Sequence, residues 1–142
     1  MCGETIMSNN TMIRGLQQGR ASFAYEYANQ IDDKLKNKFK SLAKSFPMLV
    51  KTNGLGAAVA FLFSKKDKEM GMYKLVGDSI VEWLKKDDRY KNYGLERLTD
   101  LKSLAEGAIK LNSPEYRALT IEILAFFNWL RRFAEGLAED KK

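Results

Sequence analysis

Apolar side chains recur every three or four positions along most of the chain, which is the spacing of one face of an α-helix. The clearest series lies near the C-terminus and consists of Leu119, Ile123, Phe126, Leu130, Phe133 and Leu137. Ser113 is a suitable N-cap just ahead of it, and Pro114 suits the first turn. The pattern predicts a long amphipathic helix that turns this stripe toward a core.

The same spacing predicts further helices upstream. They cover about residues 33–45, 55–65 and 72–86, with a first helix after the caps Ser8, Asn9 and Asn10 and a fifth after the polar loop 87–94. Pro47 is expected to end the second helix, because the residue before a proline avoids the α region. The pattern leaves open whether residues 12–45 form one bent helix or two.

The predicted fold class is all-α, a compact bundle of about six helices. We expect a single helical domain over residues 1–142, with frayed ends at about 1–9 and 139–142. With 45% apolar and 30% charged residues, the composition is that of a soluble globular chain. The longest apolar run, Leu55 to Phe63, is too short to span a membrane.

Histidine is absent, and Cys2 is the only cysteine. An imidazole base, a Cys-His or Ser-His nucleophile and a zinc site of Cys and His are therefore excluded within one chain. No pair of carboxylates stands out as an acid/base couple. We expect no enzyme activity, no cofactor and no metal, and, without a signal peptide or disulfide, a cytoplasmic location.

Positive charge is concentrated in one segment. Residues 34–66 contain eight lysines and no acidic residue, whereas the net charge of the whole chain is +6 and the rest sums to about −2. Lys36, Lys40 and Lys44 lie four apart and predict a ridge on one helix face, and Lys51, Lys65 and Lys66 extend the same acid-free stretch. Such asymmetry is typical of a surface that meets a polyanion. The alternative is an ordinary solvated helix face.

The last helix carries three more candidate cations, Arg117, Arg131 and Arg132. They are predicted on the side opposite the apolar stripe, where guanidinium groups can bind phosphates through two hydrogen bonds. The alternative is surface ion pairing with Glu115, Glu122 or Glu135.

A glycine pair, Gly54-x-Gly56, partly matches the dinucleotide-binding fingerprint, with Asp78 at a suitable distance. The fingerprint needs a strand on each side, whereas the spacing around Asp78 is helical. We therefore interpret Asn53-Gly54 as a turn, and Gly56 as a point of close helix packing.

Three motifs carry a resemblance to a known family. They are Gln18-x-Arg20-Ala21, the run from Phe46 to Gly56 that leads to Ala60-Phe61 and Ser64-Lys65, and Tyr116-Arg117-Ala118-x-Thr120-x-Glu122 followed by Trp129 to Ala134. In this order and spacing they resemble the small helical subunit of type III-B CRISPR effector complexes, the Cmr complex.

That resemblance implies a non-catalytic subunit that stacks in a row beside the backbone subunits and helps hold guide and target RNA in antiviral defence. The implied partners are other subunits of the type III-B complex, copies of itself, guide RNA and target RNA, with no membrane and no small-molecule substrate. The RNA-binding candidates are Arg20, Lys44, Lys51, Lys65, Arg117, Arg131 and Arg132, with Lys36 and Lys40 as secondary candidates. The alternatives are a helical protein–protein adaptor without RNA contact and a carboxylate-based enzyme that acts on nucleotides.

Overall fold

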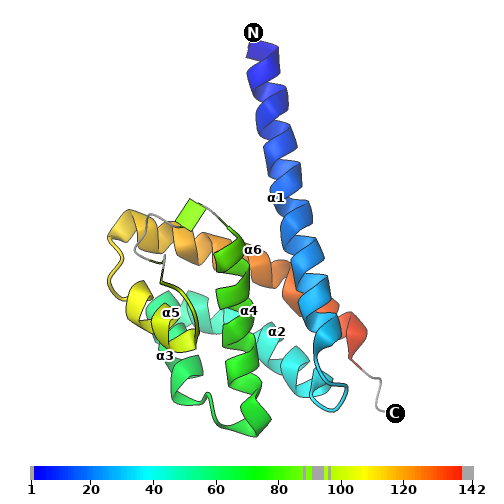
Figure 1. Ribbon diagram of the computed structural model, residues 1–142, viewed down its shortest axis with the longest axis vertical. Helices are drawn as coiled ribbons and strands as arrows, with labels where there is room; N and C mark the ends of the chain where they lie inside the picture. Colours follow the sequence, from blue (N-terminus) through cyan, green and yellow to red (C-terminus); the bar gives the residue numbers. More distant parts are fainter. Residues whose placement is uncertain (1, 88, 91–94, 96, 139–142) are drawn as a thin grey trace.

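The computed structural model describes residues 2–87, 89–90, 95 and 97–138, with side chains from residue 14 onward. Its elements are α1 (Cys2–Gln30), α2 (Lys36–Asn53), α3 (Leu55–Ser64), the 3-10 helix η1 (Glu69–Gly71), α4 (Met72–Lys86), α5 (Leu101–Ala108) and α6 (Ser113–Leu137) (Figure 1). No strand occurs among the residues described, so the predicted all-α bundle of about six helices is confirmed. None of these helices is long and apolar enough to cross a bilayer. The predicted fray at 139–142 lies outside the described residues.

Helix α6 is the central element, because α1 and α2 both pack along it. Four residues of its predicted stripe are buried, from Leu119 to Leu130, and Phe133 and Leu137 are partly buried against the same core. Phe23 of α1, Trp83 of α4 and Phe126 of α6 form an aromatic cluster with ring centroids 5.7–5.9 Å apart. These rings join three helices that are far apart in the sequence.

Two predicted helix starts are wrong. Helix α1 already begins at Cys2, ahead of the capping residues Ser8, Asn9 and Asn10. Once a helix is nucleated, each added residue gains a backbone hydrogen bond, and polar residues inside it do not stop it. The cap of α6 is Asn112 rather than Ser113, because the Asn112 side chain and Glu115 form a reciprocal capping box.

The predicted end of the second helix at Pro47 is also wrong. Helix α2 continues through Pro47 to Asn53. A proline inside a helix removes one backbone hydrogen bond. Here Phe46 and Val50, one on each side of it, are both fully buried, so tertiary packing outweighs that local cost. The segment left open as one helix or two is divided, since α1 ends at Gln30 and α2 begins at Lys36.

The glycine pair at the α2–α3 junction has the structural role that its context predicts. Gly54 has a φ of 89°, a conformation that side chains disfavour, and it ends α2. The Gly56 N–H donates to the Tyr116 hydroxyl at 2.7 Å, which ties the start of α3 to α6. Helices lie on both sides of the pair and Asp78 lies within α4, so the dinucleotide-binding interpretation is excluded.

Candidate nucleic-acid interface

A groove with a volume of about 280 Å³ runs between α2 and α6. It is lined by Lys44, Pro47, Met48 and Lys51 from α2 and by Leu124, Asn128 and Arg131 from α6. Three of the cations chosen from the sequence therefore converge on one concave surface, although Arg131 lies about 80 positions from the two lysines. The continuation of α2 beyond Pro47 makes this possible, because it carries Lys51 onto the same helix face as Lys44.

The positive charge of this groove is not neutralised within the described part of the chain. No acidic residue lines it, and neither Lys44 nor Lys51 forms an ion pair. Arg131 donates to the Asn128 side-chain oxygen at 3.4 Å, which leaves its formal charge uncompensated. Cations that face each other across a concave surface raise the local concentration of anions.

Arg117 lies on the same face of α6 as the groove, because it precedes the lining residue Leu124 by seven residues, or about two helical turns. The helical rise places it about 21 Å from Arg131 along the axis. It lines a neighbouring hollow of about 420 Å³ together with Leu111, Ser113, Tyr116 and Thr120. Arg132 is exposed beside Arg131 but lines neither surface. The alternative interpretation, ion pairs of these arginines with Glu115, Glu122 or Glu135, is not found among the described residues.

The remaining lysine candidates are dispersed. Lys65 follows α3, and its ammonium lies 4.7 Å from the Phe61 ring centroid and 5.5 Å from that of Tyr73. Lys36 pairs with Asp33 at 3.1 Å, and Lys40 is half-buried on α2. The lysine-rich segment is therefore not one continuous ridge, and flanking acids outside the segment neutralise part of it.

Arg20 does not belong to a basic surface, which corrects its prediction as an RNA contact. The side chain is buried, with the residue 8% exposed. Its guanidinium donates two hydrogen bonds to the Glu122 carboxylate, at 2.6 and 2.7 Å. An arginine with an unpaired charge is not stable in a core, so the ion pair with Glu122 determines where this residue lies.

Glu122 is the acceptor of a buried polar cluster. The Trp83 indole N–H donates to it at 3.0 Å, and Arg89 donates both to Glu122 and to Asp87. Burial by itself raises the pKa of the Glu122 carboxyl, but the hydrogen bonds from Arg20, Trp83 and Arg89 outweigh it, and the net pKa lies below its ordinary value of 4.5. The cluster is thus an ionised link between α1, α4 and α6.

Sequence reasoning missed the apolar part of the groove. Met48 is 65% exposed, and Leu124 lies in the lining between the cations. One signal for Glu122 was present: it follows Leu119 by three residues and precedes Phe126 by four, which places a carboxylate on the core stripe. A carboxylate in that position requires a buried counter-charge, and this predicts a structural partner rather than a surface one.

Comparison with known proteins gives consistent results. The sequence model of the family described as CRISPR-associated protein (Cas_Cmr5) matches residues 16–137. The chain is 32% identical over 105 residues to the CRISPR system Cmr subunit Cmr5 of Thermus thermophilus, covering 74% of this chain and 79% of that protein. A crystal structure of a Cmr5 family protein from the same organism is similar with a TM-score of 0.68 and 29% identity, covering 87% of this chain and 97% of that one.

Proposed function

This chain belongs to the Cmr5 family of CRISPR-associated proteins, and from that membership we propose that it is a non-catalytic small subunit that holds RNA in a type III-B effector complex. In this proposal it stacks with copies of itself beside the backbone subunits. The groove between α2 and α6 lies along guide or target RNA and contacts the sugar-phosphate chain.

The convergence of Lys44, Lys51 and Arg131 on that groove is the observation that carries the proposal. Phosphate contacts from lysine and arginine hold RNA without reading its sequence. A complex that takes its specificity from base pairing needs contacts of this kind. The apolar side chains between the cations, Met48 and Leu124, offer a surface for the ribose and for unstacked bases.

A few phosphate contacts per subunit give weak binding, and repetition compensates for this. Copies arranged head to tail without closing into a ring form a row. Each copy then adds its contacts to an RNA that its neighbour already holds at high effective concentration. We therefore expect tight retention by the assembled complex and weak binding by the isolated chain.

The test compares two double variants with the same change in net charge. Lys44→Glu with Lys51→Glu reverses the groove, and Lys102→Glu with Lys110→Glu reverses two exposed lysines on and after α5. In complexes reconstituted with each, we expect the groove variant to weaken target RNA retention about tenfold or more, since it replaces phosphate contacts with repulsion. Filter binding at fixed ionic strength measures this.

The control double variant is expected to retain RNA like the wild type. Equal retention by all three complexes, at equal occupancy of this subunit, would remove the RNA role from the groove. The helical adaptor without RNA contact would then be the better description.

A further inference from the structure

Helix α2 separates two hollows. Its buried face consists of Phe39, Ala43, Phe46 and Val50. The α6-side groove uses Lys44, Pro47, Met48 and Lys51, and a second groove uses Lys38, Ser41, Leu42 and Ser45. At 100° per residue the three faces lie roughly 120° apart around the helix. The second groove therefore opens on a different side of the molecule from the proposed RNA surface.

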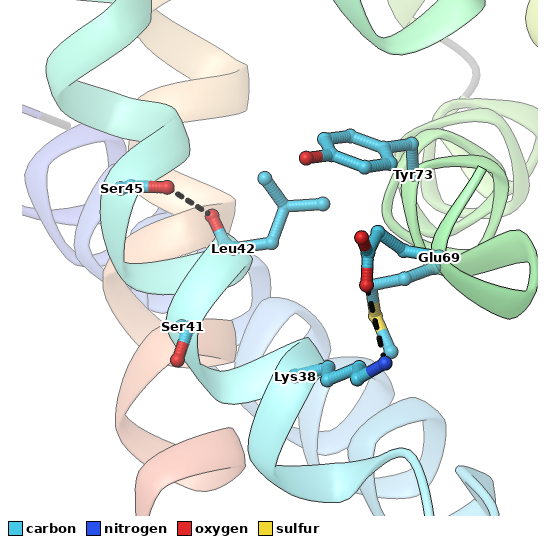
Figure 2. A pocket seen from close by; sticks show the side chains of 7 residues that line it. Lys38, Ser41, Leu42, Ser45, Glu69 and Tyr73 are labelled. Carbon is cyan, nitrogen blue, oxygen red and sulfur yellow. Dashed lines mark hydrogen bonds and ion pairs between the residues drawn. The ribbon is translucent and has the colours of Figure 1, made fainter. Parts of the chain in front are cut away.

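The second groove lies between α2 and the start of α4 and has a volume of about 440 Å³ (Figure 2). Leu42, Met72 and Tyr73 give it an apolar lining. The two serines that line it bond back to backbone carbonyls of their own helix, at 3.2 Å each. The groove therefore offers mainly an apolar surface to an incoming group.

Its charge differs from that of the α2–α6 groove. Lys38 and Glu69, on facing sides, form an ion pair of 3.1 Å, which Figure 2 shows as the dashed line between them. The lining is therefore electrically neutral and includes a half-exposed carboxylate that repels phosphate. A polyanion is favoured in the groove with three cations and no acid, and is disfavoured here.

The turn that supplies Glu69 to this groove is strained, and its next residue, Met70, carries an exposed apolar side chain. Glu69, Met70 and Gly71 have successive φ values of 52°, 59° and 81°, and the first two are not glycine. A left-handed conformation costs free energy at such residues, and strain of this kind is concentrated where a segment has a function. Met70 is 70% exposed and presents a flexible thioether to solvent.

One cation beside the groove has no acidic partner among the described residues. Lys65 rests over the rings of Phe61 and Tyr73, and Tyr73 lines the groove. Lys66 beside it is paired with Asp67 at 3.6 Å. An incoming carboxylate would therefore find Lys65 uncompensated, close to the apolar lining.

We propose that the α2–α4 groove docks a segment of a neighbouring subunit other than a copy of this chain. This segment inserts an apolar side chain beside Leu42 and Tyr73 and faces a carboxylate toward Lys65. An apolar groove next to an exposed apolar side chain suits an apolar group of a partner protein, and a lysine without an acidic partner among the described residues favours a partner that carries a carboxylate. This assignment goes beyond the proposed function, because it gives the subunit a protein-binding side separate from its RNA-binding side.

The experiment titrates the chain into a Cmr complex that lacks this subunit and measures the apparent affinity by native mass spectrometry. Met70→Asn removes the apolar side chain but suits the left-handed conformation, so it is expected to fold as stably as the wild type. Lys65→Glu reverses the proposed charge contact. We expect each to weaken incorporation about tenfold, the effect of losing one contributing contact. The Lys65→Glu effect should shrink at high salt.

Ile109→Asn is the matched control, since Ile109 is 72% exposed but follows α5; it should assemble like the wild type. The Lys44→Glu, Lys51→Glu variant should assemble normally while retaining less RNA, which separates failure of this inference from failure of the proposed function. Wild-type incorporation of Met70→Asn and Lys65→Glu would overturn the inference. Normal incorporation of Lys65→Glu with reduced RNA retention would also overturn it, because Lys65 would then contact RNA. A wild-type dimer that Met70→Asn converts to a monomer would overturn it as well, because the groove would then bind a second copy of this chain.

Discussion

At the scale of single residues, the contact between Arg20 and Glu122 gives a structural role to two of the sequence motifs. Both residues belong to the segments that carry the family resemblance, near opposite ends of the chain. The structure joins them 102 positions apart in a buried ion pair. We infer that these motifs specify the packing of α1 against α6 and are separate from the proposed RNA surface.

Replacing the acceptor should therefore cost stability. Glu122→Gln leaves the buried Arg20 without a counter-charge, and we expect a loss of about 3 kcal/mol in the free energy of unfolding. Urea unfolding followed by circular dichroism measures it. Glu135→Gln, an exposed change on the same helix, should stay within about 0.5 kcal/mol of the wild type. Similar values for both variants would contradict a structural role for the cluster.

The same cluster predicts an acid dependence. Because the folded-state pKa of Glu122 lies below its ordinary value of 4.5, its ionised form is favoured by folding. This contribution is present above the unfolded pKa and is lost as pH falls through the folded pKa. Melting temperatures measured from about pH 6 down to about pH 3 should decline, and the decline should be shallower in Glu122→Gln. Parallel profiles would assign the acid sensitivity to other carboxylates.

At the scale of elements, the local sequence and the packing of the core favour different ends for helix α2 but the same ends for helix α4. Helix α4 has the predicted bounds, Met72 to Lys86, because its apolar spacing and its ends coincide. Helix α2 passes through Pro47 because burial of Phe46 and Val50 favours a continuous helix. A boundary is thus well predicted where the local preference of the sequence and the core require the same conformation.

Helix contacts give a prediction of their own, because α4 packs closely on α5 at Gly77. A methyl group there would lie 2.7–2.8 Å from the end of the Leu101 side chain. Gly77→Ala should cost about 1–3 kcal/mol through overpacking. Gly136→Ala in α6, where no atom of the described residues lies within 4 Å of the added methyl group, should gain about 0.5–1 kcal/mol. Thermal unfolding compares them, and a stabilised Gly77→Ala would show that Leu101 moves aside without cost.

At the scale of the whole molecule, α2 presents two chemically different grooves on two of its sides. Its α6 side is cationic without an acid, and its α4 side is apolar with a balanced ion pair. A subunit that meets RNA on one side and a protein on another can join the two in an assembly. Figure 1 shows the N-terminal part of α1 extending away from the body formed by the other helices. Both grooves are lined by residues of that body, from α2, η1, α4 and α6.

The salt dependence of RNA retention tests this division. If Lys44 and Lys51 each neutralise one phosphate, the Lys44→Glu, Lys51→Glu variant should lower the slope of log affinity against log salt by about 1.4 per engaged copy. Met70→Asn should leave the slope unchanged once occupancy is equal. A titration of assembled complexes over several salt concentrations gives both values, and an unchanged slope in the charge variant would mean that those lysines do not contact phosphate.

The sequence alone determined the helical class, the core stripe of α6, the absence of histidine chemistry and the family resemblance. Each of these depends on periodicity, composition or short motifs, which act over a few residues. The tertiary structure decided which charged residues remain candidates for the RNA surface. It buried Arg20, placed Lys65 outside the α2–α6 groove, and brought Lys44 and Lys51 beside Arg131 in that groove. Those outcomes depend on which helices pack together, and the free energy of that packing comes from contacts between residues far apart in the chain.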